Sequence, residues 1–148
     1  MQSALTWNEP PLVHRENDWG PDFANDDRFT HEWWLEDGHF GPPSHQWRSY
    51  RLEDEEVARV LLSLRYVSHS PIPSPHALLI WSIEVREDLR QNGMRLGTTI
   101  VDQIAEEFSD REIYVGSIPG ANGFWTTFGW PMCDCDDCRG RNMMVRHP

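Results

Sequence analysis

The spacing of apolar residues predicts a series of strands from His45 onward. Apolar and polar side chains alternate over Gln46–Leu52, and Val57–Val67 is rich in residues favoured in strands, so the two segments predict paired strands joined by a charged turn. The prolines of Ser68–Pro75 exclude a helix and an inner strand, which predicts a loop. His76–Val85 is a nearly continuous apolar run, typical of a central strand buried on both faces of its sheet.

Beyond this run the period of the pattern changes. Leu96–Phe108 places its apolar residues on one side of a helix. A second short helix and three short strands are predicted after it, the helix at Ala121–Phe128 and the strands at Glu112–Val115, Trp130–Met132 and Asn142–Val145. A buried strand, a glycine-bearing loop and a crossover helix in this order predict an α/β domain with a mixed sheet.

The first 45 residues follow no such period. They contain four of the eight tryptophans and five of the eleven prolines, and one short helix is predicted at about Asp27–Glu36. Aromatic residues at this density favour a segment that packs against a domain. We therefore expect residues 1–45 to form an acidic, Trp-rich segment on a core domain of residues 46–148, either lining a pocket or serving as a structural lid.

Length and composition narrow the class of protein. A chain of 148 residues that is 39% apolar makes one domain with a sizeable core. Its apolar runs stay below the roughly 18 residues of a membrane span, and its first residues lack the order of a secretion signal, so we expect a cytoplasmic protein. The net charge of −11 argues against nucleic acid and anionic membranes as partners and fits a cationic one. The oligomeric state is left open, with a homodimer as one candidate.

The junction Val85–Gly97 carries the most informative chemistry. Backbone N–H groups at a helix start lack intrahelical partners, and the helix dipole adds about half a positive charge there, so an anion such as a pyrophosphate can bind. Gly93 and Gly97 would allow its close approach, and Arg90 and Arg95 would add charged contacts. Alternatively, the glycines simply serve a turn. A P-loop and a dinucleotide Rossmann site are excluded, because GxxxxGK[ST] and GxGxxG are both missing.

The stretch Ile83–Gly93 resembles the acyl-CoA signature of the GNAT superfamily of N-acetyltransferases. That signature runs apolar-x-Val, four residues, then [Arg/Gln]-x-x-Gly-x-[Gly/Ala], and Arg90 and Gly93 fit it while Arg95 stands at the last position. In a register two residues later, Gly97 is the second glycine and the opening residue is Asn92.

Asn122–Trp130 resembles the late helix of the same family, which ends in an aromatic-x-x-x-Gly-Phe pattern. The resemblance covers about Val57 to Val145 and leaves out the N-terminal segment. It implies a GNAT-like mixed, mostly antiparallel central sheet flanked by helices and splayed between its fourth and fifth strands.

The resemblance also implies a cosubstrate and its contacts. Acetyl-CoA would lie in the splayed region, with its pantetheine arm on the backbone of Ile83 and Val85. Asn122 would contact the arm or, alternatively, cap the late helix. The pyrophosphate would be held by the junction residues Arg90, Gln91, Asn92, Gly93, Met94, Arg95 and Gly97.

Acetyl transfer to an amine needs a base for the amine and an acid for the leaving thiolate. In the resembled family a tyrosine often serves as the acid, and Trp125 stands at its position here. Ser117 and Tyr114 are candidate replacements, together with Thr126 or a bound water. Glu84 is the candidate base, with pairing to an arginine across the sheet as its alternative role.

Three cysteines, Cys133, Cys135 and Cys138, lie within six residues. They could bind zinc with a fourth ligand from His147, another histidine or an aspartate. Free thiols and one disulfide pair are the alternatives. His69 and His76, which flank the start of the apolar run, are interpreted as loop residues.

These features predict an N-acetyltransferase that moves an acetyl group from acetyl-CoA to a primary amine of a cationic small molecule or peptide. The alternative hypothesis is a weakly active or inactive acyl-CoA-binding sensor or interaction module with a metal-binding Cys loop.

Overall fold

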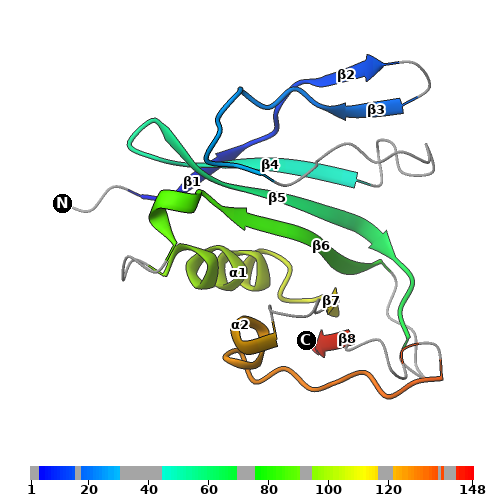
Figure 1. Ribbon diagram of the computed structural model, residues 1–148. Coiled ribbons are helices and arrows are strands. Elements are labelled where there is room, and N and C mark those ends of the chain that lie inside the picture. The colour runs from blue at the N-terminus through cyan, green and yellow to red at the C-terminus, as the bar shows by residue number, and fades with distance from the viewer. Residues whose placement is uncertain are drawn as a thin grey trace.

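The computed structural model describes residues 4–15, 18–30, 45–69, 76–90, 95–116, 122–136, 138 and 143–148. Their central feature is a six-stranded sheet in the order β1-β4-β5-β6-β7-β8 (Figure 1). The strands are β1 (Thr6–Asn8), β4 (His45–Leu52), β5 (Glu55–Tyr66), β6 (Ala77–Val85), β7 (Ile113–Gly116) and β8 (Met143–Arg146). Neighbouring strands are antiparallel except β6 and β7, which are parallel. This arrangement confirms the predicted α/β class with a mixed, mostly antiparallel sheet.

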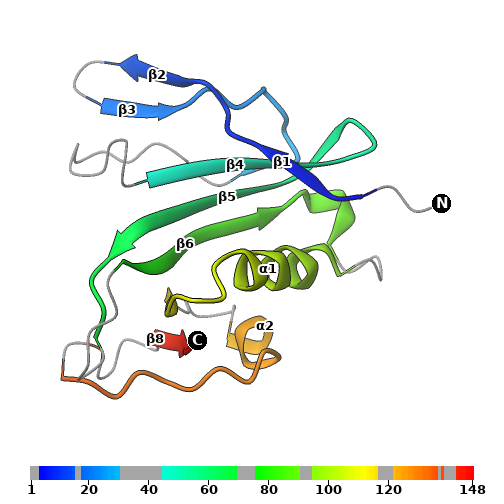
Figure 2. The ribbon, with the colours of Figure 1, turned by 180° about the vertical axis from the view of Figure 1, so that it is seen from behind.

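Helices connect the second half of the sheet. The 3-10 helix η1 (Glu87–Leu89) and α1 (Leu96–Glu107) follow β6, and α2 (Asn122–Thr126) follows β7. Strands β2 (Leu12–Arg15) and β3 (Asp18–Pro21) pair separately, on the β4 side of the molecule and away from both α-helices (Figures 1 and 2). Neither α-helix of the described residues has the length and apolar character to cross a bilayer.

Most predicted elements form where the pattern places them, with ends shifted by at most two residues. Trp130–Met132 is an exception. Met132 makes only an isolated bridge to Met144, because the neighbouring Pro131 has no N–H to donate to a ladder.

The helix predicted at Asp27–Glu36 is wrong over its described part. Residues 27–30 form a turn followed by irregular backbone, while 31–36 lie outside the described residues. The carboxylate of Asp26 accepts the backbone N–H of Arg28 at 3.0 Å, which closes a local turn in place of a helical one.

The helices cover one face of the sheet. The buried residues of α1 form one stripe at helical spacing: Leu96, Ile100, Val101 and Ile104. They share a core with Trp125 of α2 and with sheet residues that include Tyr50, Ala58, Val60, Leu62, Leu78, Ile80, Ile113, Val115 and Met144. Burial of this stripe fixes α1 between β6 and β7 in the crossover of the parallel pair.

Residues that follow β1 in the N-terminal segment lie on the opposite face. Trp47 and Leu61 are directly opposite each other on β4 and β5, and their side chains alternate with those of the helix-covered face. Leu12 and Phe23 pack against this pair. The sheet is therefore covered by helices on one side and by the early part of the chain on the other.

Arg59 stabilises the contact between β5 and the N-terminal segment. Its guanidinium lies 4.4 Å from the centre of the Phe23 ring and 4.1 Å from that of Phe29. It donates to the carbonyl of Ala24 at 2.7 Å and pairs with Glu56 at 2.8 Å. Arg59 is buried, so these partners offset the cost of removing its charge from water.

A one-residue bulge interrupts β6 at Trp81. Leu62 pairs with Ile80 and the preceding Leu61 pairs with Ser82, so Trp81 has no opposite residue on β5. Beyond the bulge, Glu84 lies opposite Arg59 and hence on the face of the N-terminal segment. Strict alternation from Ile80 would have put it on the helix face.

Burial lowers the pKa of His45 from its ordinary value of 6.5. Below about pH 6.5 the unfolded chain therefore binds more protons at this residue, and stability is lost as the pH falls. We expect His45→Gln to reduce the loss of unfolding free energy between about pH 7 and pH 5, measured by urea denaturation. His14→Gln, at an exposed site, serves as the control. Equal losses in wild type and His45→Gln would contradict this account.

Candidate functional site

Among the described residues, β6 is paired with β7 only near its start, and the rest of this edge of β6 is referred to as the opening. The two strands pair only from Leu78 opposite Ile113 to Ile80 opposite Val115, whereas β6 continues to Val85. The far end of β6 thus leaves the parallel ladder while it stays paired with β5 on its other edge. Because these are the fourth and fifth strands of the sheet order, the opening lies where the sequence predicts the splay.

Two residues at the end of β6 direct their backbone polar groups toward this opening. The N–H of Arg86 donates to the carbonyl of Val57 at 2.9 Å. Ala58 and Val85 are therefore a non-hydrogen-bonded pair of the antiparallel ladder between β5 and β6. Hydrogen-bonded and non-bonded pairs alternate along an antiparallel ladder, so Ile83 is in the same position as Val85. The N–H and C=O groups of both residues therefore point away from β5.

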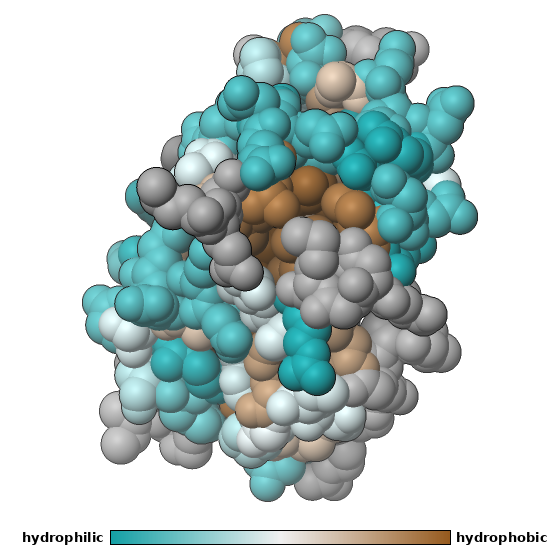
Figure 3. Space-filling model, turned by 90° about the vertical axis from the view of Figure 1, so that its left-hand side faces the viewer, coloured by the Kyte–Doolittle hydropathy of each residue, from teal (hydrophilic) through white to brown (hydrophobic). Residues whose placement is uncertain are grey.

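Figure 3 views the side of the molecule on which β6 ends and α1 begins. Apolar surface is recessed there within a hydrophilic rim, next to residues drawn in grey.

Three elements meet closely at Gly97 in the first turn of α1. A β-carbon built there would lie 3.2 and 3.3 Å from ring atoms of Phe124 in α2 and 3.7 Å from Cγ2 of Val85. The lack of a side chain at Gly97 therefore lets α1, α2 and β6 approach one another.

The start of α1 shows the features of an anion site only in part. Arg95 precedes the helix with φ 52° and ψ 45°, and its carbonyl accepts the first intrahelical bond from Thr99 at 3.0 Å. The N–H groups of residues 96–98 come before this bond and have no helical partner. The predicted loop residues Gln91, Asn92, Gly93 and Met94 lie outside the described residues.

Arg90 turns back onto β6. Its Nε donates to the carbonyl of Val85 at 2.8 Å, and its Nη2 lies 3.3 Å from Oε2 of Glu84. In this conformation Arg90 bonds to one of the backbone groups that face the opening. Its side chain is 46% exposed and has room to move.

Glu84 is buried and joins three parts of the chain. Its Oε2 accepts the backbone N–H of Thr30 at 2.7 Å and the Thr30 hydroxyl at 3.3 Å, in addition to the contact with Arg90. Glu84 thus pairs with an arginine, but with Arg90 of the following segment, whereas Arg59, which lies opposite Glu84 on β5, pairs with Glu56 at 2.8 Å. No sequence signal indicated Thr30, which is 54 residues away along the chain.

The candidate proton donors for the thiolate lie in different parts of the chain. Tyr114 is buried, and its hydroxyl accepts the backbone N–H of His69 at 2.9 Å. Ser117 lies outside the described residues, and Asn122 begins α2 with its side chain outside them.

Trp125, at the position of the usual tyrosine, is a buried core residue. Its ring lies 4.8 Å from that of Phe124, 5.8 Å from Phe128 and 6.4 Å from Trp130, measured between centroids. This aromatic packing gives Trp125 a structural role in the described site.

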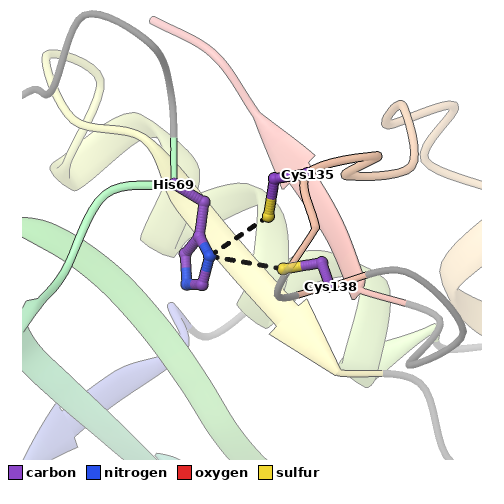
Figure 4. A group of neighbouring side chains, drawn as sticks. All are labelled: His69, Cys135 and Cys138. Atoms are coloured by element: carbon purple, nitrogen blue, oxygen red, sulfur yellow. Dashed lines mark hydrogen bonds between the residues drawn. The ribbon is translucent and has the colours of Figure 1, made fainter.

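The cysteines form a second cluster with a histidine (Figure 4). Nδ1 of His69 lies 3.4 Å from Sγ of both Cys135 and Cys138. Sγ of Cys133 lies 3.5 Å from that of Cys135. His69, predicted as a loop residue, lies in the segment after β5 and is the histidine of this cluster. His147 instead lies 3.2 Å from Glu112.

The thiols of this cluster differ in acidity. Burial raises the pKa of Cys135, but hydrogen bonds with Cys138, Cys133 and His69 outweigh it and bring the pKa down to about 7. Burial, together with its bonds to the other thiols, raises the pKa of Cys138 to about 12. The cluster therefore favours a thiolate at Cys135.

The three-dimensional structure of this protein resembles those of known proteins. The chain matches no family model, and its sequence matches no curated protein. An acetyltransferase from Thermus thermophilus superposes with a TM-score of 0.54 at 21% identity, over 71% of this chain and 65% of that one. The Bacillus subtilis N-acetyltransferase YlbP in complex with coenzyme A superposes with a TM-score of 0.52 at 19% identity, over 69% of this chain and 67% of that one.

This chain has a GNAT-like acetyltransferase fold. The fold predicted from the resemblance is confirmed. Within this fold, the opening presents backbone donors and acceptors of Ile83 and Val85 along one edge of β6.

The hydrogen bonds of Glu84 predict that removing its carboxylate destabilises the fold. Glu84→Ala would leave the N–H of Thr30 without its acceptor, and we expect a loss of about 1–3 kcal/mol in unfolding free energy. Glu87→Ala, at an exposed side chain in η1, is the matched control and should change stability by less than about 0.5 kcal/mol. Urea denaturation of both variants measures the difference, and similar small effects would contradict the tethering role of Glu84.

Proposed function

We propose that this protein is an N-acetyltransferase that moves an acetyl group from acetyl-CoA to a primary amine. The observation that carries the proposal is the end of β6, where the N–H and C=O groups of Ile83 and Val85 face an opening in a GNAT-like fold. An extended pantetheine arm carries amides that can bond to such a strand edge as a further strand would. The coenzyme A complex of the Bacillus subtilis neighbour supports this choice of cosubstrate.

The junction after β6 would hold the pyrophosphate. The N–H groups at the start of α1 and the charges of Arg90 and Arg95 favour an anion there, together with the backbone of Gln91, Asn92, Gly93, Met94 and Gly97. Arg90 would release the carbonyl of Val85 and turn toward the phosphates, so that one side chain exchanges an internal partner for the ligand.

The transfer itself requires two proton movements. The amine nitrogen bonds to the acetyl carbonyl carbon, the carbon–sulfur bond breaks, the amine loses a proton and the thiolate gains one. Glu84 would accept the amine proton, because it is a buried carboxylate at the end of β6. Ser117 or Tyr114 would supply the proton to the thiolate, and Tyr114 would have to give up its bond to the N–H of His69 to present its hydroxyl.

The acceptor that fits best is a cationic amine. A protein with a net charge of −11 attracts cations over distances of about a Debye length. We therefore propose a small polyamine-like molecule or a basic peptide as the acetyl acceptor.

A second candidate function is acyl-CoA binding with little turnover. The buried packing of Trp125 favours it, because the usual proton donor of the late helix is replaced by a core residue. Acetyl-CoA binding without thiol release over a panel of amines would indicate this function.

The binding half of the proposal is tested at Gly93. We expect Gly93→Glu to weaken coenzyme A binding at least about 100-fold in calorimetry, because it adds bulk and a negative charge where the pyrophosphate would lie. Gln103→Glu adds the same charge at an exposed position of α1 and should leave the affinity unchanged. Unchanged affinity in Gly93→Glu would overturn the placement of the pyrophosphate.

The catalytic half is tested at Glu84. Glu84→Gln keeps an oxygen that accepts the Thr30 N–H but cannot take a proton, so we expect kcat to fall by about 10²–10⁴-fold with coenzyme A affinity retained. Glu87→Gln is the control. Thiol release from acetyl-CoA with spermidine and a lysine-containing peptide as acceptors measures the rate. A kcat for Glu84→Gln within about twofold of wild type would show that Glu84 is not the base.

A further inference from the structure

The Cys and His cluster joins two segments that are far apart in the chain. His69 follows the end of β5, and Cys133, Cys135 and Cys138 lie between α2 and β8. The ligand atoms of His69, Cys135 and Cys138 all lie within 4.8 Å of one another. Figure 4 shows the two sulfur atoms turned toward the same nitrogen of the imidazole ring.

We propose that His69, Cys133, Cys135 and Cys138 bind one zinc ion that links the segment after β5 to the segment before β8. The proposal concerns the structure of the sheet and does not depend on acetyl transfer. One nitrogen and three sulfur ligands form the closed Cys₃His set of structural zinc sites, which leaves no position for a substrate.

The distances fit a tetrahedral ion. Zinc bonds of about 2.3 Å to sulfur and 2.0 Å to nitrogen place two sulfurs about 3.8 Å apart and a sulfur about 3.5 Å from the nitrogen. The structure has 3.5 Å between Sγ of Cys133 and Cys135, and 3.4 Å from Nδ1 of His69 to each of the sulfurs of Cys135 and Cys138. Cys133 lies outside the group of three whose ligand atoms are within 4.8 Å of one another, so its side chain would have to turn toward the other ligands to complete the set.

A disulfide explains the cluster less well. A sulfur–sulfur bond is about 2.05 Å long, whereas the sulfurs of Cys133 and Cys135 are 3.5 Å apart. One disulfide would also leave a third thiol and the imidazole without a shared partner. Zinc uses all four groups.

The surroundings of His69 hold its ring in the orientation of a ligand. Its second nitrogen, Nε2, lies 3.1 Å from the hydroxyl of Tyr66, so the ring can donate there while Nδ1 keeps its lone pair for the metal. Its backbone N–H donates to Tyr114 at 2.9 Å. The ring also lies against both tyrosines, with centroid distances of 5.4 Å to Tyr66 and 5.3 Å to Tyr114.

The site would fix the edge of the sheet. The N–H of Cys133 donates to the carbonyl of Met143 at 2.7 Å, and β8 pairs with β7. A metal bond from this segment to His69 therefore ties β7 and β8 to the end of β5. Because β8 is a short edge strand, its ladder with β7 contributes little stability, and the metal link would add to it.

The first test is the metal content of the full chain, purified without chelators and measured by inductively coupled plasma mass spectrometry. We expect about one zinc ion per chain, and a chelator should lower the melting temperature and expose the three thiols to a thiol reagent. Protein that is folded and metal-free, and that takes up neither zinc nor cobalt when titrated, would overturn the proposal. Iron or copper in place of zinc would overturn the choice of metal.

Variants then assign the ligands. His69→Gln and Cys138→Ser should each lower the zinc content to below about a fifth of the wild-type value, while His147→Gln should retain it. Zinc retained at the wild-type level in His69→Gln would exclude the histidine as a ligand. If a ligand variant does not fold, the absorption of cobalt-substituted wild type still decides, since three thiolates and tetrahedral geometry give characteristic bands and other geometries do not.

Tyr66→Phe tests the support of the imidazole without removing a ligand. We expect about 10–100-fold weaker zinc binding in a chelator competition, with the cobalt spectrum unchanged in shape. Wild-type affinity in this variant would contradict the role of Tyr66.

Discussion

The end of the pairing between β6 and β7 is the constraint on which the candidate site depends. Parallel strands are normally paired along their whole common length, and each peptide group left over must find another partner. Here β7 ends at Gly116, one residue after the last pair of Ile80 with Val115, while β6 runs on to Val85. The backbone groups of Ile83 and Val85 that face away from β5 are the ones proposed to bind the cosubstrate.

Contacts on both sides stabilise this separation. On the β6 side, Arg86 bonds to the carbonyl of Val57 and to Asp88, which fixes the strand end to β5 and to η1. On the β7 side, Tyr114 bonds to the segment after β5 through His69, next to the Cys and His cluster. The N-terminal segment then reaches the same strand end through Thr30 and Glu84. The site is thus assembled from three parts of the chain that meet only in the folded state.

The sequence predicted the helices and strands whose positions follow from hydrophobic periodicity. It did not predict the side-chain partners that are set by long-range packing. The helical spacing of Leu96 to Ile104 and the apolar run of β6 located α1 and the central strand, because burial selects one face of each. Nothing in the local pattern marks Trp81 as an extra residue, and so the face of Glu84 could not be derived. The partners Thr30 and His69 were equally hidden, since each lies in a loop whose position depends on the whole fold. The domain boundary near residue 45 stays a prediction.

The bulge at Trp81 has an unusual consequence for how this strand can evolve. In an ordinary strand, losing one residue reverses the facing of every side chain beyond it and exposes the core. In β6 the extra residue has no opposite on β5, so its loss would restore a regular ladder and leave Ile83, Glu84 and Val85 on their present faces. The core would survive such a deletion, but the added bend and twist that accompany a bulge would vanish, and with them part of what carries β6 away from its parallel neighbour. A one-residue deletion there would change the course of β6 along the opening while keeping the packing of the core.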